Sequence, residues 1–545
     1  MKLLRVHIIA AKTCGGLLDG MDIWFRSPTV EPTSFEPLCL VGPNGAGKSQ
    51  FLQVVAEIFQ SIFHATVDKE ERQEGNSHLQ FEIEYLIRPK DGNQAVHVRA
   101  TRLAQGKRKH GVVISKKLNG EWIECDLQAP ATLTLLPLKI VGYTSGDNET
   151  LSLPFLLSRS GYADEVGRRA LEEHADLEAV PDTRLMLIDY GTHLEVLVAN
   201  LLLGTDDARA ALLQEARQDN IHSFRCIVQL AHRVISKVPR RRQSVTARKG
   251  IQLTAELEKY LDQLRRCSTC YHHEERTDTY IFDFLVDEQT TLAFRHFWSS
   301  ALDLYVAFHK LAMLNDLAIP RTTRNRFKKE TQLRRFASRL PEPQDEDKVF
   351  RFERVAFNAS DSKEIVDYVS LSDGEHQLVQ LLGTLCMVSF PGVLFLLDEP
   401  ESHFNPQWRV KFTSRLLDLP TIDGKRREKE SDVSQQDCLL TTHAPFIASD
   451  TPRDRVFIFR KDLDDGKVKV KRPDIETYGT TFDSILEECF DVRPPISQIP
   501  REEIAELMES DDPGTIKMGI QRLGQSVEKV FLADRLRQVM KKDEA

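Results

Sequence analysis

Apolar positions change from short runs and alternation near the N-terminus to a helical period in the middle of the chain. Residues 38–41 form an apolar run, and apolar side chains recur at helical spacing over residues 51–63. Residues 79–125 alternate between apolar and polar positions and contain turn signals such as Asn119-Gly120. These patterns predict a buried strand, a helix and an antiparallel meander, and residues 138–143 predict a further core strand.

The segment 151–345 is mainly helical by periodicity and lacks heptads sustained over several turns. We predict helices over residues 185–203, 253–264 and 291–317. A compact helical domain therefore suits this segment better than a long coiled-coil arm. The C-terminal part predicts two short helices, at 502–509 and 526–541.

Residues 378–397 imitate a membrane span, because they carry no charge over a length that can cross a bilayer. Pro391-Gly392 divides this stretch into a helix-length half and a strand-length half, and the second half runs directly into Asp398. A buried helix, a tight turn and a core strand are therefore expected, and no membrane segment is predicted.

Composition narrows the class of protein. The 545 residues carry 73 basic and 82 acidic side chains, a formal net charge of −9, and 41% of them are hydrophobic. These values are typical of a globular protein of several folding units, and they exclude a disordered chain and a disulfide-stapled scaffold. Nine scattered cysteines and the lack of an export signal favour reduced thiols and a cytoplasmic location.

The most specific motif is a glycine-rich loop between the predicted strand and the helix that follows it. Its sequence is Gly42-Pro43-Asn44-Gly45-Ala46-Gly47-Lys48-Ser49, the pattern of a P-loop. Backbone N–H groups of such a loop surround phosphate oxygens, while Lys48 reaches the β- and γ-phosphates and Ser49 binds Mg²⁺. We expect ATP and Mg²⁺ as cofactors, with these binding residues: Gly42, Asn44, Gly45, Ala46, Gly47, Lys48, Ser49 and Gln50.

A second motif completes the phosphate chemistry. The apolar run 393–397 ends in Asp398 and Glu399, as expected of a buried parallel strand whose carboxyl end meets the ligand. We expect Asp398 to join Ser49 in holding Mg²⁺, directly or through water. Glu399 is expected to orient or deprotonate the attacking water.

A third motif, Ser372-Asp373-Gly374-Glu375, opens a helix 26 residues before Asp398. Ser372 and Glu375 have the spacing of a capping box, in which two side chains satisfy the first N–H groups of a helix. The segment also resembles the signature of ABC-type ATPases in their SMC/Rad50-like and defence-related forms. The resemblance implies that Ser372, Gly374 and Glu375 bind the ATP held by the opposite subunit of a dimer. Both roles are compatible.

Two further segments resemble parts of the same family. His443 follows a short apolar run and resembles the switch histidine, which contacts the γ-phosphate and the attacking water. Residues 400–406 occupy the position of the D-loop, which communicates across the dimer in that family. The Q-loop position at 144–149 has no glutamine, and Asn148 is the candidate for its replacement. The catalytic residues that we expect are Lys48, Glu399 and His443.

The spacing of the motifs predicts the architecture. Lys48 and Asp398 are 350 residues apart, whereas a βαβ unit takes roughly 30 residues. The expected fold class is therefore α/β, an ABC-type P-loop ATPase head split by a large, mainly helical insertion. We divide the chain into an N-terminal ATPase lobe with the P-loop and an antiparallel β-subdomain (1–150), a helical insertion (151–345), a C-terminal ATPase lobe (346–460) and a C-terminal helical appendage (461–545).

Two features of the insertion leave alternatives open. One group of residues has three alternative interpretations: half of a zinc site, a hook that joins two insertions, or ordinary packing or surface residues. Its members are Cys267, Cys270, His272 and His273. The basic clusters at 240–249 and 321–340 are either a nucleic-acid contact or solvated faces. In the appendage, the acidic residues 462, 464 and 465 lack the context of a TOPRIM metal site, so no intrinsic nuclease is expected.

Three further segments resemble one family of defence ATPases in particular. Segments 143–149, 187–195 and 441–446 look like PtuA, the ATPase family of Septu-type and retron-associated antiphage systems. The resemblance implies a homodimer or higher oligomer that closes on ATP and controls a separate HNH nuclease subunit (PtuB-like), in some systems with a reverse transcriptase and its DNA–RNA product. The alternatives are an SMC/Rad50-like DNA repair ATPase and an overcoming-lysogenization-type ATPase-nuclease. Missing coiled arms count against the first, and a missing nuclease motif counts against the second.

Overall fold

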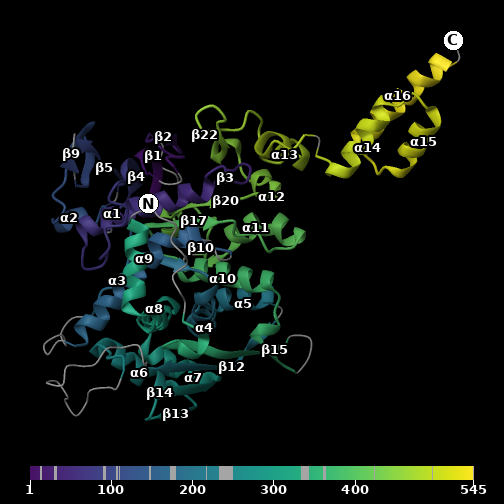
Figure 1. Ribbon diagram of the computed structural model, residues 1–545. Coiled ribbons are helices and arrows are strands. Elements are labelled where there is room, and N and C mark those ends of the chain that lie inside the picture. The colour runs from purple at the N-terminus through teal and green to yellow at the C-terminus, as the bar shows by residue number, and fades with distance from the viewer. Residues whose placement is uncertain are drawn as a thin grey trace.

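The structure is a computed structural model in which three main sheets are surrounded by helices and a small helical unit projects from them at the C-terminus (Figure 1). Two small sheets pair β6 (Ala104–Gln105) with β7 (Arg108–Lys109) and β18 (Pro420–Thr421) with β19 (Gly424–Lys425). The structure describes residues 1–12, 15–29, 33–89, 92, 94–105, 108–109, 111–145, 149–171, 179–216, 218–231, 250–332, 343–359, 364–422, 424–493 and 495–543.

A seven-stranded sheet at the centre is assembled from distant parts of the chain. Its order is β11 (Leu185–Ile188), β10 (Lys139–Thr144), β17 (Val393–Asp398), β20 (Asp437–Thr441), β3 (Leu38–Val41), β21 (Val456–Lys461) and β22 (Val468–Lys471). All neighbours are parallel except β22, which is antiparallel to β21. β3, β17 and β20 are buried throughout, as expected for a parallel sheet covered on both faces. The carboxyl ends of these three strands therefore lie side by side.

One face of the central sheet packs on a core shared with α1 (Lys48–Thr66) and a six-stranded antiparallel sheet. The order of that second sheet is β2 (Met21–Trp24), β1 (Lys2–Ala10), β4 (Gln80–Ile87), β5 (Val96–Arg102), β8 (Val113–Leu118) and β9 (Glu121–Glu124). Its last hairpin turns at Asn119 and Gly120, whose φ values are 51° and 91°. The antiparallel meander predicted for residues 79–125 is confirmed.

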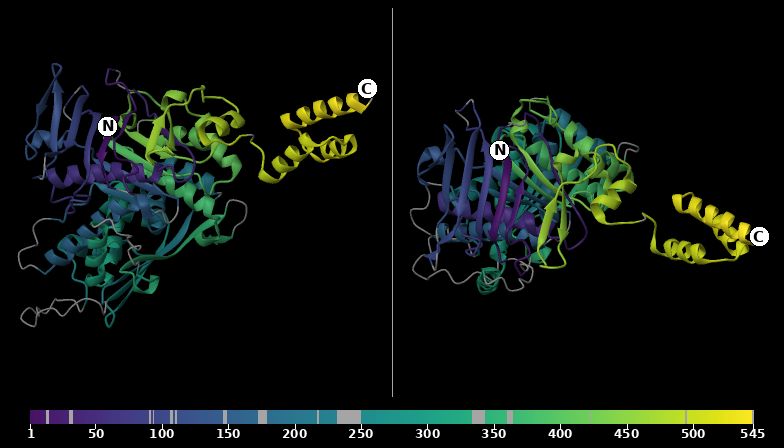
Figure 2. Two further views of the ribbon diagram at one scale, coloured as in Figure 1. Left: turned by 45° about the horizontal axis from the view of Figure 1, so that its top comes forward. Right: turned by 90° about the horizontal axis from the view of Figure 1, so that it is seen from above.

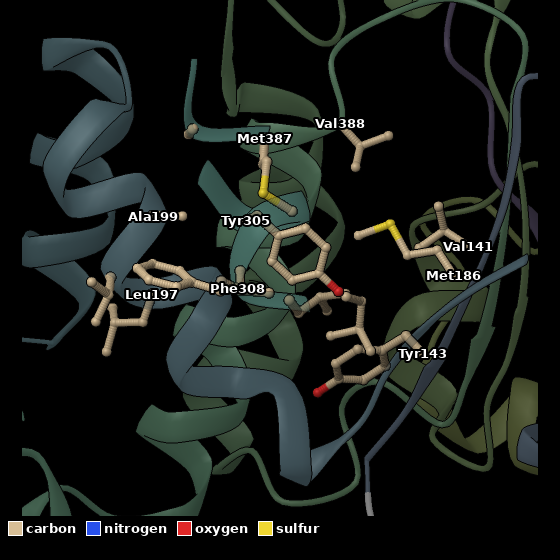
Figure 3. Packing of buried hydrophobic residues seen from close by; sticks show 14 of the residues in the cluster. Val141, Tyr143, Met186, Leu197, Ala199, Tyr305, Phe308, Met387 and Val388 are labelled. Atoms are coloured by element: carbon tan, nitrogen blue, oxygen red, sulfur yellow. The ribbon is translucent and has the colours of Figure 1, made fainter. Parts of the chain in front are cut away.

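The other face of the central sheet packs on α4 (His193–Leu203), α8 (Ala301–Met313) and α10 (Asp373–Met387). Figure 3 shows this core, in which Tyr143 of β10 and Met186 of β11 lie near Tyr305 of α8 and Met387 of α10. The segment 151–345 therefore shares a hydrophobic core with the central sheet.

The helices predicted in this segment are confirmed only in part. The helix expected at 253–264 is α6 (Ala255–Cys267), which begins two residues later than predicted. The helix expected at 291–317 is divided into α7 (Glu288–Phe297) and α8, because Ser300 caps a new helix. The prediction of one helix over 185–203 is wrong, since residues 185–188 form β11 and α4 begins at His193. Four consecutive apolar residues fit a buried strand as well as a helix, and parallel pairing with β10 favours the strand.

A five-stranded antiparallel sheet was not predicted. Its order is β13 (Cys270–Glu274), β14 (Thr279–Leu285), β12 (Gln218–Gln229), β15 (Phe350–Ala359) and β16 (Ile365–Asp367). β12 pairs along most of its length with β15, more than a hundred residues away in the chain. The remaining helices of the first 345 residues are α2 (Pro130–Leu133), α3 (Glu149–Arg169), α5 (Asp206–Ala216) and α9 (Arg321–Gln332).

The apolar stretch 378–397 is a helix, a turn and a strand, as predicted: α10, a tight turn at Gly392 and β17. α11 (Pro406–Asp418) and α12 (Pro445–Ser449) follow β17 and β20. Among the described helices, none has the length and apolar character needed to cross a membrane.

The C-terminal part of the chain, from residue 461, is divided between the main part of the molecule and a separate group of three helices. β22 completes the central sheet, and α13 (Phe482–Phe490) packs beside α12. α14 (Gln498–Glu509), α15 (Pro513–Arg522) and α16 (Val527–Asp543) pack on one another and extend away from the sheets (Figure 2). The helix predicted at 502–509 lies within α14, and the helix predicted at 526–541 is α16, which begins one residue later.

Candidate functional site

The glycine-rich loop connects the end of β3 to the start of α1. Gly42, Gly45 and Gly47 have φ values of 136°, 76° and 87°, a conformation that residues with a Cβ rarely adopt. A Cβ at Gly42 would collide with the carbonyl oxygen of Phe459 on β21. Because α1 begins at Lys48, the unpaired N–H groups of its first turn face the loop. The loop is therefore shaped to bind an anion such as a phosphate.

Lys48 lies buried under this loop. Its Nζ donates hydrogen bonds to the carbonyl oxygens of Gly42 at 2.8 Å and Pro43 at 3.2 Å, and it lies 3.4 Å from Nδ1 of His443. Burial lowers the pKa of Lys48 to about 8, although the carboxylates of Glu399 and Asp398 oppose this shift. A bound phosphate would add negative charge, so phosphate binding and protonation of Lys48 favour each other.

Asp398 connects the first turn of α1 with the ends of β17 and β20. Its Oδ1 accepts hydrogen bonds from Oγ of Ser49 at 3.0 Å and from Oγ1 of Thr441 at 2.5 Å. Burial raises the pKa of Asp398, and the two hydroxyl donors oppose this shift. A carboxylate and a hydroxyl are hard oxygen ligands that suit Mg²⁺.

The remaining ligands of such an ion would come from phosphate oxygens and water. The described residues contain no group of three or more His, Cys, Asp and Glu side chains that could hold a metal ion by themselves. Mg²⁺ in phosphate-transfer sites is commonly bound through one or two carboxylates together with substrate phosphates. Ser49 and Asp398 therefore fit an ion that arrives with a nucleotide.

Glu399 and His443 meet at the carboxyl ends of β17 and β20. Nε2 of His443 lies 2.8 Å from Oε1 of Glu399, and the backbone N–H of Glu399 donates to Oγ1 of Thr441 at 3.0 Å. Glu399 has a φ of 47°, so the chain turns sharply directly after β17. The hydrogen bond from His443 is the largest cause that holds the pKa of Glu399 below its usual range. About 38% of the Glu399 side chain is exposed, so the carboxylate can reach solvent.

The third motif caps the signature helix, α10. The Oγ and backbone N–H of Ser372 are each 2.8 Å from Oε2 of Glu375, and the backbone N–H of Glu375 donates to Oγ of Ser372 at 3.4 Å, which confirms the capping box. A Cβ at Gly374 would lie 2.8 Å from the carbonyl oxygen of His403. Among the described residues, no hydrogen bond joins this motif to the glycine loop. One chain thus presents two separate surfaces, the glycine loop and the exposed start of α10.

The other residues that were predicted to bind nucleotide make fewer contacts with the rest of the site. Asn44 is exposed, Ala46 is buried in the loop, and Gln50 is half-buried on the first turn of α1. Asn148, the candidate for the Q-loop, lies outside the described residues. These four positions add no contact that tests their predicted role.

The candidate zinc residues are dispersed. Cys267 is buried at the end of α6, whereas Cys270 is exposed at the start of β13. His273 stacks on Tyr280 and lies 3.0 Å from Asp278. Within the described part of the chain these residues form no group of three or more that could hold a metal ion by themselves.

The basic clusters are described only in part. Residues 240–249 lie outside the described ranges, as do residues 333–340. Within α9, Arg324 and Lys328 both pair with Asp164, and Arg326 lies 2.7 Å from Glu330. Three of the five described basic residues of the second cluster are therefore engaged in ion pairs.

Sequence reasoning missed three polar residues beside the site. Thr441 binds Asp398 and Glu399, and Thr442 donates its hydroxyl hydrogen bond to the buried carboxyl of Glu401. The signal was present in the sequence, because two threonines follow an apolar run and the carboxyl ends of neighbouring parallel strands meet at one edge.

Comparison with known proteins agrees with this chemistry over part of the chain. Residues 275–449 match the family described as AAA domain, putative AbiEii toxin, Type IV TA system. The matched range contains Ser372, Asp398, Glu399 and His443, whereas the glycine loop precedes it. The match supports an AAA/ABC-type ATPase domain, which binds nucleotide. None of the curated proteins compared with the chain matches it.

Proposed function

We propose that the chain is an ATP-binding and ATP-hydrolysing regulatory subunit of an antiphage defence complex, which dimerises head to head on ATP and controls a separate nuclease. The observation that supports the ATPase part best is the meeting of Lys48, Ser49, Asp398, Glu399 and His443 at one edge of the central sheet. The matched family supports the same activity. The defence role and the nuclease partner rest on the resemblance of segments 143–149, 187–195 and 441–446 to the PtuA family.

The proposed reaction is hydrolysis of ATP to ADP and phosphate. Backbone N–H groups of the glycine loop and Nζ of Lys48 would bind the phosphates, and Ser49 with Asp398 would hold Mg²⁺. When bound, the ion neutralises charge on the β- and γ-phosphates. Glu399 would accept the proton of the attacking water, and His443 would keep that carboxylate ionised and in place.

The second copy would supply the signature. Ser372 is exposed at the N-terminus of α10, where unpaired N–H groups can bind an anion. In the proposed dimer, Ser372 and Gly374 of one chain contact the γ-phosphate held by the glycine loop of the other. Bound ATP would then hold the two ATPase heads of the dimer together.

A direct test combines hydrolysis with oligomeric state. Purified chain is expected to release phosphate from ATP with Mg²⁺, and Lys48→Ala is expected to abolish both ATP binding and hydrolysis. Glu399→Gln should bind ATP, hydrolyse it at least about 100-fold more slowly, and accumulate as a dimer by light scattering. Glu509→Gln, at an exposed site on α14, is the matched control. Hydrolysis by Glu399→Gln at the wild-type rate would refute the catalytic assignment.

A second assay tests the finer role. The chain alone, incubated with Mg²⁺ and DNA or RNA, is expected to leave the nucleic acid intact, because a separate nuclease is proposed. Cleavage that persists in Lys48→Ala would favour an overcoming-lysogenization-type ATPase-nuclease. Stable binding to DNA ends without any nuclease partner would favour a DNA repair ATPase.

A further inference from the structure

Two residues after Glu399 lies a buried carboxyl group, that of Glu401. Glu401 is only 2% exposed, and its Oε1 accepts a hydrogen bond from the hydroxyl of Thr442. Its Oε2 is buried and has no hydrogen-bond partner among the described residues. Buried polar atoms are nearly always satisfied, and one that is not costs stability. The carboxyl therefore calls for an explanation other than stability.

Thr442 connects this carboxyl to His443. The hydroxyl of Thr442 donates to Glu401, and its oxygen accepts the backbone N–H of Ala444 at 2.9 Å. The two contacts fix the chain on both sides of His443, whose Nε2 lies 2.8 Å from Glu399. Loss of the carboxyl would free the loop that carries the imidazole.

The other end of the link lies beside the signature helix. Glu401 belongs to a turn in which the N–H of Phe404 donates to its carbonyl oxygen at 3.0 Å. Arg409 on α11 donates to the carbonyl oxygens of Phe404 at 2.8 Å and Ser402 at 2.7 Å. The carbonyl of His403 in the same turn approaches Gly374 of α10. Glu401 thus connects a turn held against the signature helix with the loop that presents His443.

We propose that Glu401 is a positioning residue for hydrolysis: by accepting the Thr442 hydroxyl, it couples the turn at 399–404 to the position of His443. This inference rests on the proposed ATPase function. A shift of the turn, as a second copy contacts the signature helix, would move His443 relative to Glu399. Hydrolysis would then depend on how the two heads meet.

The surroundings of Glu401 set its pKa and make the expected rate of hydrolysis depend on pH. Burial raises the pKa of Glu401 to about 7, and the charge of Glu399 acts in the same direction, whereas the hydrogen bond from Thr442 and the charge of Arg409 oppose this shift. Cys39 on β3 and Tyr143 on β10 also interact electrostatically with this carboxyl. Ionisation strengthens the hydrogen bond from Thr442, because a charged acceptor is the stronger one, so the maximal rate is expected to rise as the pH passes about 7.

The test compares four variants in hydrolysis at saturating ATP and in ATP affinity. Glu401→Ala and Thr442→Val should each lower the maximal rate roughly tenfold or more, since either removes the hydrogen bond, with the ATP Kd changed less than about threefold. Thr442→Ser keeps the hydroxyl and should recover most of the rate. Glu401→Gln keeps an acceptor oxygen but not the ionisation, so its rate should stay constant across about pH 7, where the wild-type rate rises.

Each result supports or overturns the inference. The double variant Glu401→Ala/Thr442→Val should be no slower than the slower single variant, because both remove one link; multiplied losses would overturn the coupling. A fall in ATP affinity equal to the fall in rate, or a wild-type pH profile in Glu401→Gln, would also overturn it. Should Glu401→Ala not fold, the Thr442 variants decide the question. Absence of hydrolysis by the wild-type chain would instead refute the proposed function.

Discussion

Nε2 of His443 lies 2.8 Å from Oε1 of Glu399, and this contact joins the carboxyl ends of β20 and β17. The contact holds the pKa of Glu399 below its usual range, with Lys48 adding to the effect. The carboxylate is therefore ionised throughout the neutral pH range, which is the form that can accept a proton from water. A variant without the imidazole should therefore keep the Glu399 carboxyl group but change its pKa.

We predict that His443→Ala moves the acid limb of the kcat–pH profile to higher pH. The pKa of Glu399 should rise toward its ordinary value when its hydrogen-bond partner is lost, so less of the carboxylate is ionised at pH 5. Phosphate release measured between pH 4.5 and about 8 checks this shift. An acid limb that stays in place would mean that another group limits the rate at low pH.

The glycine loop offers a matched pair of substitutions. Gly42→Ala should prevent nucleotide binding and destabilise the chain by several kcal/mol, because a Cβ there meets the carbonyl oxygen of Phe459 on a packed strand. Gly45 also has a positive φ, but a Cβ there meets nothing within 4 Å, so Gly45→Ala should cost only about 1–2 kcal/mol.

Urea unfolding and binding of a fluorescent ATP analogue distinguish the two glycine variants. Equal destabilisation by both would show that backbone conformation, and not the approach of β21, limits the loop. Binding of ATP by Gly42→Ala with wild-type affinity would mean that the loop can move away from Phe459.

A substitution at Gly374 should affect dimerisation without affecting nucleotide binding. A Cβ at this position would lie 2.8 Å from the carbonyl oxygen of His403, so Gly374→Ala should displace the start of α10 from the turn that follows β17. The variant should still bind ATP within about twofold of wild type, since the glycine loop is a separate site. Light scattering with ATP should show a monomer, whereas a stable ATP-bound dimer would exclude α10 from the interface.

Local signals predicted the site better than the fold around it. The P-loop, β17 with its two carboxylates and the capping box of Ser372 were predicted, because each is encoded within a few consecutive residues. The prediction failed at β11, where four apolar residues suit a helix or a buried strand equally well. The sheet of β12 and β15 was missed because its pairing joins distant segments. Glu401 and Thr442 were missed for the same reason, since their contact spans 41 residues.

A last prediction concerns stability and pH. Glu195 on α4 is buried, and its Oε2 has no hydrogen-bond partner among the described residues. Burial raises the pKa of Glu195 from 4.5 to about 8, the charge of Asp189 acts in the same direction, and Lys348 and Arg159 oppose it. The folded state thus binds a proton more tightly than the unfolded state. The contribution that protonated Glu195 makes to the free energy of unfolding is fully present below pH 4.5. It is lost as the pH rises to about 8.

Glu195→Gln keeps the shape of the side chain and removes this ionisation. The variant and the wild type should depend on pH alike below pH 4.5, and the variant should gain relative stability as the pH rises, by up to about 1.4 kcal/mol per pH unit. Above about pH 8 the difference should become constant. Urea unfolding across this pH range measures it, with Glu509→Gln on the exposed face of α14 as the control. A constant difference between wild type and Glu195→Gln from pH 5 to about 8 would show that Glu195 is ionised in the folded protein, because only a pKa that changes on folding produces a slope.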